Sequence, residues 1–310
     1  MQLEDVIKEL KKMKAKRVFV QFPEGLKLRI QNMSKQLEKE GFEIVLCLEA
    51  TWGACDVREH EAKLLKCDAI LHIAHEDFGV KTTMPVVYWD YLIDADPTPI
   101  LEKEFNKLEP YQKIGLVTSI QYIKTLPVVK KFLEKRGKEV FIGKGDKIPG
   151  QMLGCRVGAG ILIEDKVDAF LCITAGQFYG LGLALKSNKP LLNLDLEQNS
   201  IYRLDTLKKK VEKITAWNIA QVKEARRIGI LVSWKLGQFT LPFEIKKKLE
   251  KIGKEVFIIA MDEFTTAKLE GLKLDALVNT ACPRIGTDDL EKYKLPIVNV
   301  EHLYKGKIIS

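Results

Sequence analysis

Leu249-Glu-Lys-Ile-Gly-Lys-Glu-Val-Phe-Ile258 is a segment that the chain repeats. Leu133-Glu-Lys-Arg-Gly-Lys-Glu-Val-Phe-Ile142 is almost the same sequence, and Leu37-Glu-Lys-Glu-Gly-Phe-Glu-Ile-Val-Leu46 is a third copy. In each copy, helix-forming residues run up to a glycine and a short apolar run follows. Glycine is common just past the end of a helix, where it caps the last turn. Each segment therefore predicts a helix end followed by a strand.

The segment belongs to a longer repeat of alternating strands and helices. An apolar run precedes each copy, a run that begins Asp-Ala follows it, and a fourth run begins with proline. This alternation predicts βαβ units in a parallel sheet, and continuous apolar strands are typical of a sheet covered on both faces. The runs are Arg17–Gln21, Asp68–Ile73 and Pro85–Tyr88 in the first copy, Lys113–Val117, Asp168–Ile173 and Pro190–Asn193 in the second, and Arg227–Leu231, Asp275–Thr280 and Pro296–Asn299 in the third.

The repeat predicts an α/β protein of three homologous domains, each with a parallel four-stranded sheet, arranged around a pseudo-threefold centre. A repeat of about 100 residues is within the ordinary size of a domain. Charged helical connectors near Pro99–Pro110 and Ile201–Arg226 separate the copies. We therefore expect domains at residues 1–98, 99–200 and 201–310.

Composition favours a globular protein of the cytoplasm. The 310 residues are 46% hydrophobic and 30% charged, and no apolar run is long enough to span a membrane. The N-terminus has the pattern of an amphipathic helix and not of a signal peptide. The net charge of +8 is spread over helix faces such as Lys208–Lys210, which favours a solvated surface. Without a nucleic-acid-binding motif, we expect neither a direct nucleic-acid partner nor a membrane.

The six cysteines fall into two groups of three. Three lie in or beside apolar strands, where cysteine commonly packs as a core residue. The other three lie in loops rich in glycine and polar residues, one in each repeat, after a predicted strand. Carboxyl ends of strands in open α/β sheets are where ligands bind. The strand cysteines are Cys47, Cys67 and Cys172, and the loop cysteines are Cys55, Cys155 and Cys282.

If the three loops converge, their thiolates can hold a metal. Disulfides are rare in the cytosol, and three is the wrong number for pairing. Three thiolates suit a zinc ion with an open fourth position or an iron-sulfur cluster that lacks its fourth cysteine. The sequence has no Cys-x-x-Cys pair, so neither a zinc ribbon nor the usual radical-enzyme cysteine loop is predicted.

The surroundings of these cysteines resemble a known family. Trp52-Gly-Ala-Cys-Asp56, Gly150-Gln-Met-Leu-Gly-Cys155 and Asn279-Thr-Ala-Cys-Pro-Arg284 are similar to the three cysteine motifs of the archaeal diphthamide-synthesis enzymes, the 2-(3-amino-3-carboxypropyl)histidine synthases. The resemblance covers essentially the whole chain, including its length, its triplicated domains and the order of the cysteines.

The resemblance implies a non-classical radical enzyme that uses S-adenosylmethionine. Cys55, Cys155 and Cys282 would bind three irons of a [4Fe-4S] cluster, and the cofactor would bind the fourth. In this family the 3-amino-3-carboxypropyl group is transferred to a histidine of elongation factor 2, and methylthioadenosine is released. This transferase reaction begins diphthamide biosynthesis. The resemblance also implies a homodimer and a reductant, whose identity the sequence does not indicate.

Four polar residues are candidates for contacts with S-adenosylmethionine. The cofactor carries a carboxylate, which a guanidinium can bind through two hydrogen bonds, and Arg284 lies two residues after Cys282. Gln238 is a second candidate, and Ser233 and Gln177 are weaker ones. His75 occupies the position of Cys282 in the first repeat, so it either lines the same site or caps a loop.

Two other functions fit the bare architecture. The predicted architecture also resembles that of quinolinate synthase, in which three pseudo-symmetric α/β domains each supply one cysteine to a [4Fe-4S] cluster. That enzyme catalyses a dehydration. The motif surroundings match that enzyme less well. A non-enzymatic protein that binds a small ligand or zinc is the second alternative.

Overall fold

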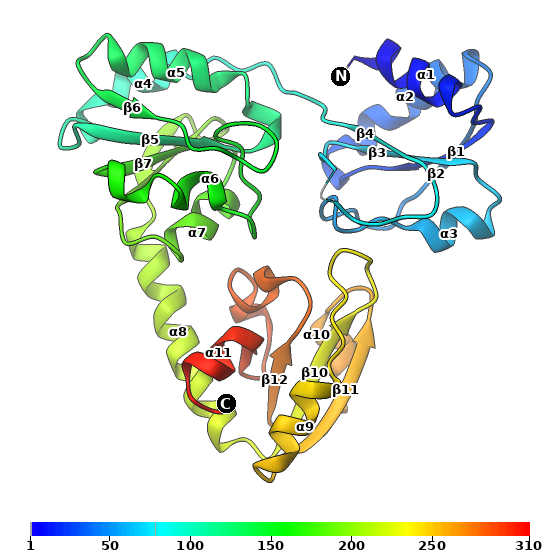
Figure 1. Ribbon diagram of the computed structural model, residues 1–310, viewed down its shortest axis with the longest axis vertical. Helices are drawn as coiled ribbons and strands as arrows, with labels where there is room; N and C mark the ends of the chain where they lie inside the picture. Colours follow the sequence, from blue (N-terminus) through cyan, green and yellow to red (C-terminus); the bar gives the residue numbers. More distant parts are fainter. Residues whose placement is uncertain (1, 78) are drawn as a thin grey trace. The chain divides into compact units, whose positions relative to one another are not determined.

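A computed structural model of the chain describes residues 2–77 and 79–310. It contains three separate β-sheets, each with helices packed against it (Figure 1). The chain divides into two compact units, which are described one by one below. The first unit is Met1–Ile93 together with Trp234–Phe239, and the second is Asp94–Ser233 together with Thr240–Ser310.

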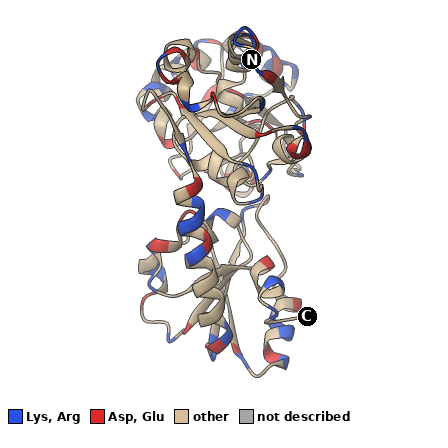
Figure 2. Ribbon diagram, turned by 90° about the vertical axis from the view of Figure 1, so that its left-hand side faces the viewer, with Lys and Arg blue, Asp and Glu red and all other residues tan. Residues whose placement is uncertain are grey.

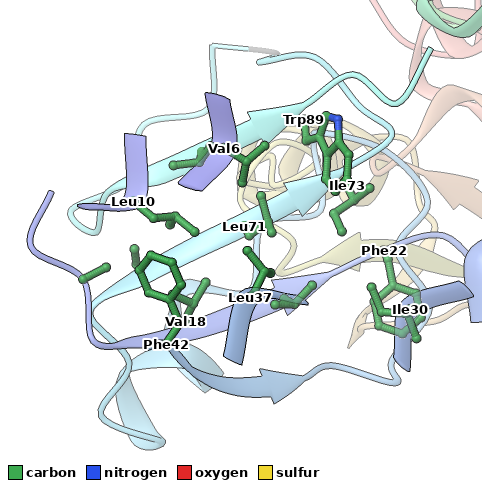
Figure 3. Packing of buried hydrophobic residues seen from close by; sticks show 14 of the residues in the cluster. Val6, Leu10, Val18, Phe22, Ile30, Leu37, Phe42, Leu71, Ile73 and Trp89 are labelled. Atoms are coloured by element: carbon green, nitrogen blue, oxygen red, sulfur yellow. The ribbon is translucent and has the colours of Figure 1, made fainter. Parts of the chain in front are cut away.

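The first unit contains a fully parallel four-stranded sheet in the order β2-β1-β3-β4. Helices α1 and α2 cover one face of the sheet and α3 covers the other (Figure 1). On the α1 side, Val6 and Leu10 pack against Leu71 (Figure 3). The elements are α1 (Leu3–Lys12), β1 (Arg17–Gln21), α2 (Lys27–Lys39), β2 (Glu43–Leu46), α3 (Glu59–Leu64), β3 (Ala69–Ile73) and β4 (Val86–Trp89).

The second unit begins with a five-stranded sheet in the order β6-β5-β7-β8-β9. Its first four strands are parallel, and β9 pairs with β8 in the antiparallel direction. Buried clusters cover both faces. The elements are α4 (Thr98–Glu104), β5 (Lys113–Thr118), α5 (Thr125–Glu134), β6 (Glu139–Phe141), α6 (Gly158–Ile161), β7 (Ala169–Thr174), α7 (Phe178–Ala184), β8 (Leu191–Asp195), β9 (Ser200–Arg203) and α8 (Asp205–Glu224).

The second unit also contains a parallel four-stranded sheet in the order β11-β10-β12-β13. Helix α8 packs against β13, and α9 packs against β11. The elements are β10 (Arg227–Ser233), α9 (Phe243–Lys251), β11 (Glu255–Met261), α10 (Thr266–Leu269), β12 (Ala276–Asn279), β13 (Ile297–Asn299) and α11 (Val300–Lys305). Short 3-10 helices span Glu24–Leu26, Phe105–Lys107, Ile120–Tyr122, Glu164–Lys166, Pro283–Gly286 and Leu290–Lys292.

The expected fold class, three α/β sheets that are mainly parallel, is confirmed, with one correction in the middle sheet. The prediction of four strands was wrong there, because Ser200–Arg203 forms a fifth strand. The sequence predicts a helical connector from residue 201 onward. Ile201 is instead fully buried beside β8, and the charged helix begins only at Asp205.

The repeated glycines end helices as predicted. Gly41, Gly137 and Gly253 have φ angles of 91°, 78° and 83°, a left-handed conformation that glycine adopts without a steric cost. In each copy the backbone N–H of the next residue donates to the carbonyl of the repeated leucine, as from Lys254 to Leu249 at 3.2 Å. The three copies of the repeat thus share one local structure.

The aspartate before the third strand of each repeat has the same role in all three sheets. The Oδ2 of Asp68 accepts hydrogen bonds from two backbone N–H groups at the start of β1, at 2.8 and 2.7 Å. Asp168 does the same at the start of β5 and Asp275 at the start of β10. These bonds lower the pKa of Asp68 and Asp275 below the usual value. They fix the register at the amino ends of paired strands, opposite the edge that carries the cysteine loops.

Charged residues of both signs alternate along the helices (Figure 2). Ion pairs one helical turn apart, such as Lys246–Glu250, are part of this pattern. This distribution of charged residues fits the solvated helix surface that the sequence predicts. None of the described helices has both the length and the apolar character needed to cross a membrane.

Candidate functional site

The structure separates the six cysteines as the sequence predicts. Cys47, Cys67 and Cys172 are buried in the cores. Burial raises the pKa of each of these thiols, that of Cys172 to about 12. A thiol held in its neutral form is a poor metal ligand, because thiolates bind metals. Cys55, Cys155 and Cys282 are only partly buried, and none of the six, all of which are described, forms a disulfide.

The loop that carries Cys55 is fixed to the end of β1 by a buried glutamine. Gln21 is fully buried. Its Nε2 donates to the backbone carbonyl of Asp56 at 2.9 Å, and its Oε1 accepts from the backbone N–H of Arg58 at 2.9 Å. The side-chain amide of Gln21 therefore forms a hydrogen bond with the residue on each side of Val57. This places the cysteine loop at the carboxyl edge of the first sheet.

A second segment of chain, Trp234–Phe239, lies against the same loop within the first unit. The backbone N–H of Gly237 donates to the carbonyl of Cys55 at 2.9 Å. The Nε2 of Gln238 donates to the Sγ of Cys55 at 3.3 Å. Lys235 forms a buried ion pair with Asp56, the residue after the cysteine. Cys55 thus contacts a part of the chain about 180 residues away.

In the second unit, Cys155 lies in a loop after β6 that is fixed to the end of β5. The backbone N–H of Met152 donates to the carbonyl of Thr118 at 2.8 Å, and Gly150 has a φ of 79° that favours glycine. Burial raises the pKa of the Cys155 thiol, and the nearby cations Arg156, Lys186 and Arg284 oppose that rise. Those cations favour the thiolate form.

Cys282 follows β12, and two asparagines fix its loop. The Nδ2 of Asn279 donates to the carbonyl of Cys282 at 2.8 Å and to the Oδ1 of Asn299 at 2.7 Å. The Nδ2 of Asn299 donates to the carbonyl of Pro283 at 2.8 Å. A Cβ on Gly286 would lie 2.3 Å from the Oδ1 of Asn299, so glycine is required for this close approach.

Arg284 connects the Cys155 and Cys282 loops of the second unit. Its Nη1 donates to the carbonyl of Gly154 at 3.2 Å, and its guanidinium lies 3.9 Å from the centre of the Phe178 ring. The guanidinium also pairs with Asp288. Burial lowers the pKa of Arg284, while Asp288 and the two cysteines act to raise it. Only 7% of Arg284 is exposed, and its guanidinium is in contact with a backbone carbonyl, a carboxylate and an aromatic ring.

The other three candidates for cofactor contacts lie in different parts of the structure. Ser233 is the fully buried last residue of β10. Gln177, at the start of α7, lines a cavity of about 160 Å³ in the second unit, together with Lys210 and Asp288. The second unit thus places Gln177 near the partner of Arg284. Gln238 is in the first unit, against Cys55.

His75 pairs with a second histidine. The Nε2 of His72 and the Nδ1 of His75 are 3.1 Å apart, and the His72 ring lies 5.4 Å from the ring of Tyr88. Burial lowers the pKa of His75 to about 4 and that of His72 well below 6.5. Both imidazoles are therefore neutral in the folded protein at neutral pH. The structure favours the loop-packing interpretation of His75 over a charged role.

Because of this histidine pair, we expect the free energy of unfolding to fall in acid. Unfolded histidines bind protons below about pH 6.5, whereas the folded pair resists protonation. The stabilising contribution is therefore fully present above pH 6.5 and is lost as the pH falls through about 4. The slope is at most about 1.4 kcal/mol per pH unit for each imidazole. His75→Gln should flatten the decline in unfolding free energy measured by urea denaturation between pH 7 and 4. Replacement of the exposed His60 by Gln is the control and should leave the decline as it is in the wild type. Equal slopes of unfolding free energy against pH in the two variants would contradict the role of the histidine pair.

The three loop cysteines have the chemistry that an iron-sulfur cluster requires. Clusters are held by cysteine thiolates, and hydrogen bonds to the sulfurs tune them. Cys55 receives an N–H donor at its sulfur, and Cys155 has three cations around it. Cys55 belongs to the first unit and the other two cysteines to the second. Among the described residues, no three His, Cys, Asp or Glu side chains are grouped to hold a metal ion.

These features define a class of protein: three α/β sheets, with one partly buried cysteine in a loop after a strand of each sheet. Residues 22–304 match the family model described as "Putative diphthamide synthesis protein". The chain belongs to this diphthamide synthesis family.

Relatives of the chain have consistent names. It is 34% identical to the 2-(3-amino-3-carboxypropyl)histidine synthase of Pyrococcus horikoshii over 95% of this chain and 86% of the relative. It is 28% identical to the enzyme of the same name from Methanocaldococcus jannaschii, over 97% of this chain and 88% of the relative. With subunit 1 of that synthase from Kluyveromyces lactis it shares 28% identity, over 90% of this chain and 68% of the relative.

Solved structures extend the likeness to three dimensions. The crystal structure of Dph2 from Pyrococcus horikoshii matches with a TM-score of 0.90 and 31% identity, over 99% of this chain and 90% of that one. The crystal structure of the same protein with a 4Fe-4S cluster matches equally well. The expected family is confirmed.

Some residues of the site were not predicted from the sequence. Gln21, Lys235 and Gly237 position the Cys55 loop, and the sequence does not indicate that role for any of them. The sequence places Asp56 in the cysteine motif but gives it no role of its own. An acidic residue next to a candidate ligand is a detectable signal, but its lysine partner is 179 residues away, and a single sequence does not indicate such a pair.

Proposed function

We infer that the chain is a 2-(3-amino-3-carboxypropyl)histidine synthase. It transfers the 3-amino-3-carboxypropyl group from S-adenosylmethionine to a histidine by a radical mechanism that depends on a [4Fe-4S] cluster, in diphthamide synthesis. The observation that carries this conclusion is the match of nearly the whole chain to a relative whose structure holds a 4Fe-4S cluster. When bound, the cluster supplies the electron that cleaves the cofactor.

We propose that Cys55, Cys155 and Cys282 are the cluster ligands. They are the three cysteines outside the cores, each in a loop with its own set of hydrogen bonds. The chain's part in the chemistry is to hold these sulfurs and to place the cofactor. Gln21 and Asn279 fix two of the loops, and Arg284 joins the loops of the second unit.

Contacts with S-adenosylmethionine are proposed for Gln238, Arg284, Ser233 and Gln177. Gln238 has the best support, because its amide lies at a proposed cluster ligand. Its Oε1 and its second N–H are then available for the cofactor's amino acid group. Arg284 already binds Gly154 and Asp288, so a cofactor carboxylate there would compete with Asp288.

The reaction class implies a protein substrate, which we propose is elongation factor 2. We also propose that the chain acts in the cytoplasm as a homodimer and takes electrons from a separate reductant. Three domains at residues 1–98, 99–200 and 201–310 remain our proposal. That division is supported by the separate buried clusters of each sheet.

An anaerobic assay tests the proposed function. The reconstituted protein should be brown, contain about four irons per chain, as a [4Fe-4S] cluster requires, and show a paramagnetic signal on reduction. With reductant and S-adenosylmethionine it should release methylthioadenosine. Deoxyadenosine as the only product, or a colourless protein without iron after reconstitution, would refute the proposal.

A further inference from the structure

The loop around Cys55 is completed by six residues that come from far along the chain. Trp234–Phe239 follow β10 directly, yet they belong to the first unit, whereas Ser233 and Thr240 on either side belong to the second. Within the first unit this segment contacts the cysteine at the backbone and at the sulfur. The contacts are the Gly237 N–H to the Cys55 carbonyl at 2.9 Å and the Gln238 Nε2 to the Cys55 Sγ at 3.3 Å.

Gly237 approaches the backbone of Cys55 too closely for residue 237 to carry a side chain. A Cβ on Gly237 would lie 2.6 Å from the Cα and 2.7 Å from the Cβ of Cys55. The Cα is a backbone atom and the Cβ is bonded directly to it, so neither atom can rotate away. Glycine at position 237 therefore allows the segment to approach closely enough for Gln238 to reach the sulfur.

Charge holds the segment in this position. Lys235 and Asp56 form an ion pair whose side chains are only 4% and 1% exposed. Arg58 lies 3.8 Å from the same carboxylate. A buried pair is strongly destabilised when one partner leaves, because the other charge is then uncompensated. The segment is thus fixed beside Cys55, and the Gln238 amide is held at the sulfur.

We propose that Gln238 is a positioning residue that acts through Cys55: its amide N–H donates to the sulfur and raises the reduction potential of the bound cluster. This inference rests on the proposed function, which makes Cys55 a cluster ligand. Reduction adds negative charge to the cluster and its sulfurs, and a hydrogen bond to an ionised acceptor strengthens with that charge. Hydrogen bonds to the sulfurs are among the factors that set cluster potentials.

Redox titration followed by electron paramagnetic resonance tests the proposal on the reconstituted full chain. Gln238→Leu removes the donor, and Gln238→Glu replaces it with a carboxylate of the same length. Both should keep four irons per chain and show a more negative potential. About a tenfold change in the reduction equilibrium is expected for Gln238→Leu, which is 59 mV for one electron. Gln31→Leu, the same change at an exposed position of α2, should titrate like the wild type.

The outcomes separate this inference from the function on which it rests. A wild-type protein that takes up no cluster would overturn both. A wild type with cluster and methylthioadenosine release, together with a Gln238 variant that keeps its cluster at the wild-type potential, would overturn the role of Gln238 alone.

Gly237→Ala tests the geometry independently of the hydrogen-bond donor. The added methyl group must push the segment away from Cys55, so this variant should also shift the potential downward although Gln238 is intact. Gly25→Ala is a matched control, because a Cβ there meets nothing within 4 Å. A Gly237→Ala protein with the wild-type potential would contradict the proposal.

Discussion

Cys282→Ala is expected to lose both the cluster and the activity. Cys282 immediately precedes the 3-10 helix Pro283–Gly286, in the loop after β12 to which Asn279 and Asn299 donate hydrogen bonds. No nearby side chain is placed to supply a replacement thiolate within that loop. Loss of an outer-shell partner alone typically costs 10–100-fold in metal affinity or activity. We expect loss of a ligand to exceed about 100-fold in the release of methylthioadenosine.

Cys172→Ala is the matched control for this prediction. Cys172 is fully buried in β7, and its neutral thiol packs against apolar side chains. This variant should retain iron and activity. Iron content, the visible spectrum and methylthioadenosine release measure both variants. A Cys282→Ala protein with wild-type activity would refute the assignment of Cys282 as a ligand.

Lys235→Met is expected to lower the unfolding free energy by about 3 kcal/mol. Removing one partner of a buried ion pair typically costs 3–5 kcal/mol, because the remaining charge is left in a medium of low polarity. Arg58 stays 3.8 Å from the Asp56 carboxylate, so the lower end of that range applies. Urea denaturation measures the change.

Lys210→Met is the control for the loss of a lysine. Its partner is Glu291, and the two side chains are 54% and 66% exposed, so the cost should be within about 1 kcal/mol. Adding Asp56→Asn to Lys235→Met should recover part of the lost stability, since the uncompensated charge is then removed. A Lys235→Met protein as stable as Lys210→Met would show that the buried pair does not stabilise the first unit.

The sequence was sufficient to predict the strands that repeat. Apolar runs bounded by a capping glycine such as Gly41 and a repeated aspartate such as Asp68 are local signals, and the structure confirms both. The strand at Ser200–Arg203 was missed because it has no counterpart in the other repeats. Its two apolar residues, Ile201 and Tyr202, are adjacent and give no clear periodicity beside a long charged helix.

The candidate site was predictable in its cysteines but not in their partners. Cys172, in a strand, is buried, and Cys155, in a loop, is only partly buried, as their places in the sequence indicate. The sequence makes Arg284 a candidate for binding the cofactor because it is two residues from a cysteine. Its contacts with Gly154 and Phe178 come from segments more than 100 residues away. Packing between distant segments decides such contacts, and no local pattern encodes them.

Transfer of label from S-adenosylmethionine to elongation factor 2 tests the proposed activity directly. The reconstituted, reduced protein would be incubated anaerobically with cognate elongation factor 2 and cofactor labelled in its aminocarboxypropyl group. We expect label on one histidine of the factor, equimolar with methylthioadenosine, and no label when that histidine is replaced. Release of methylthioadenosine with the factor unlabelled, or label that persists without the histidine, would contradict the proposed activity.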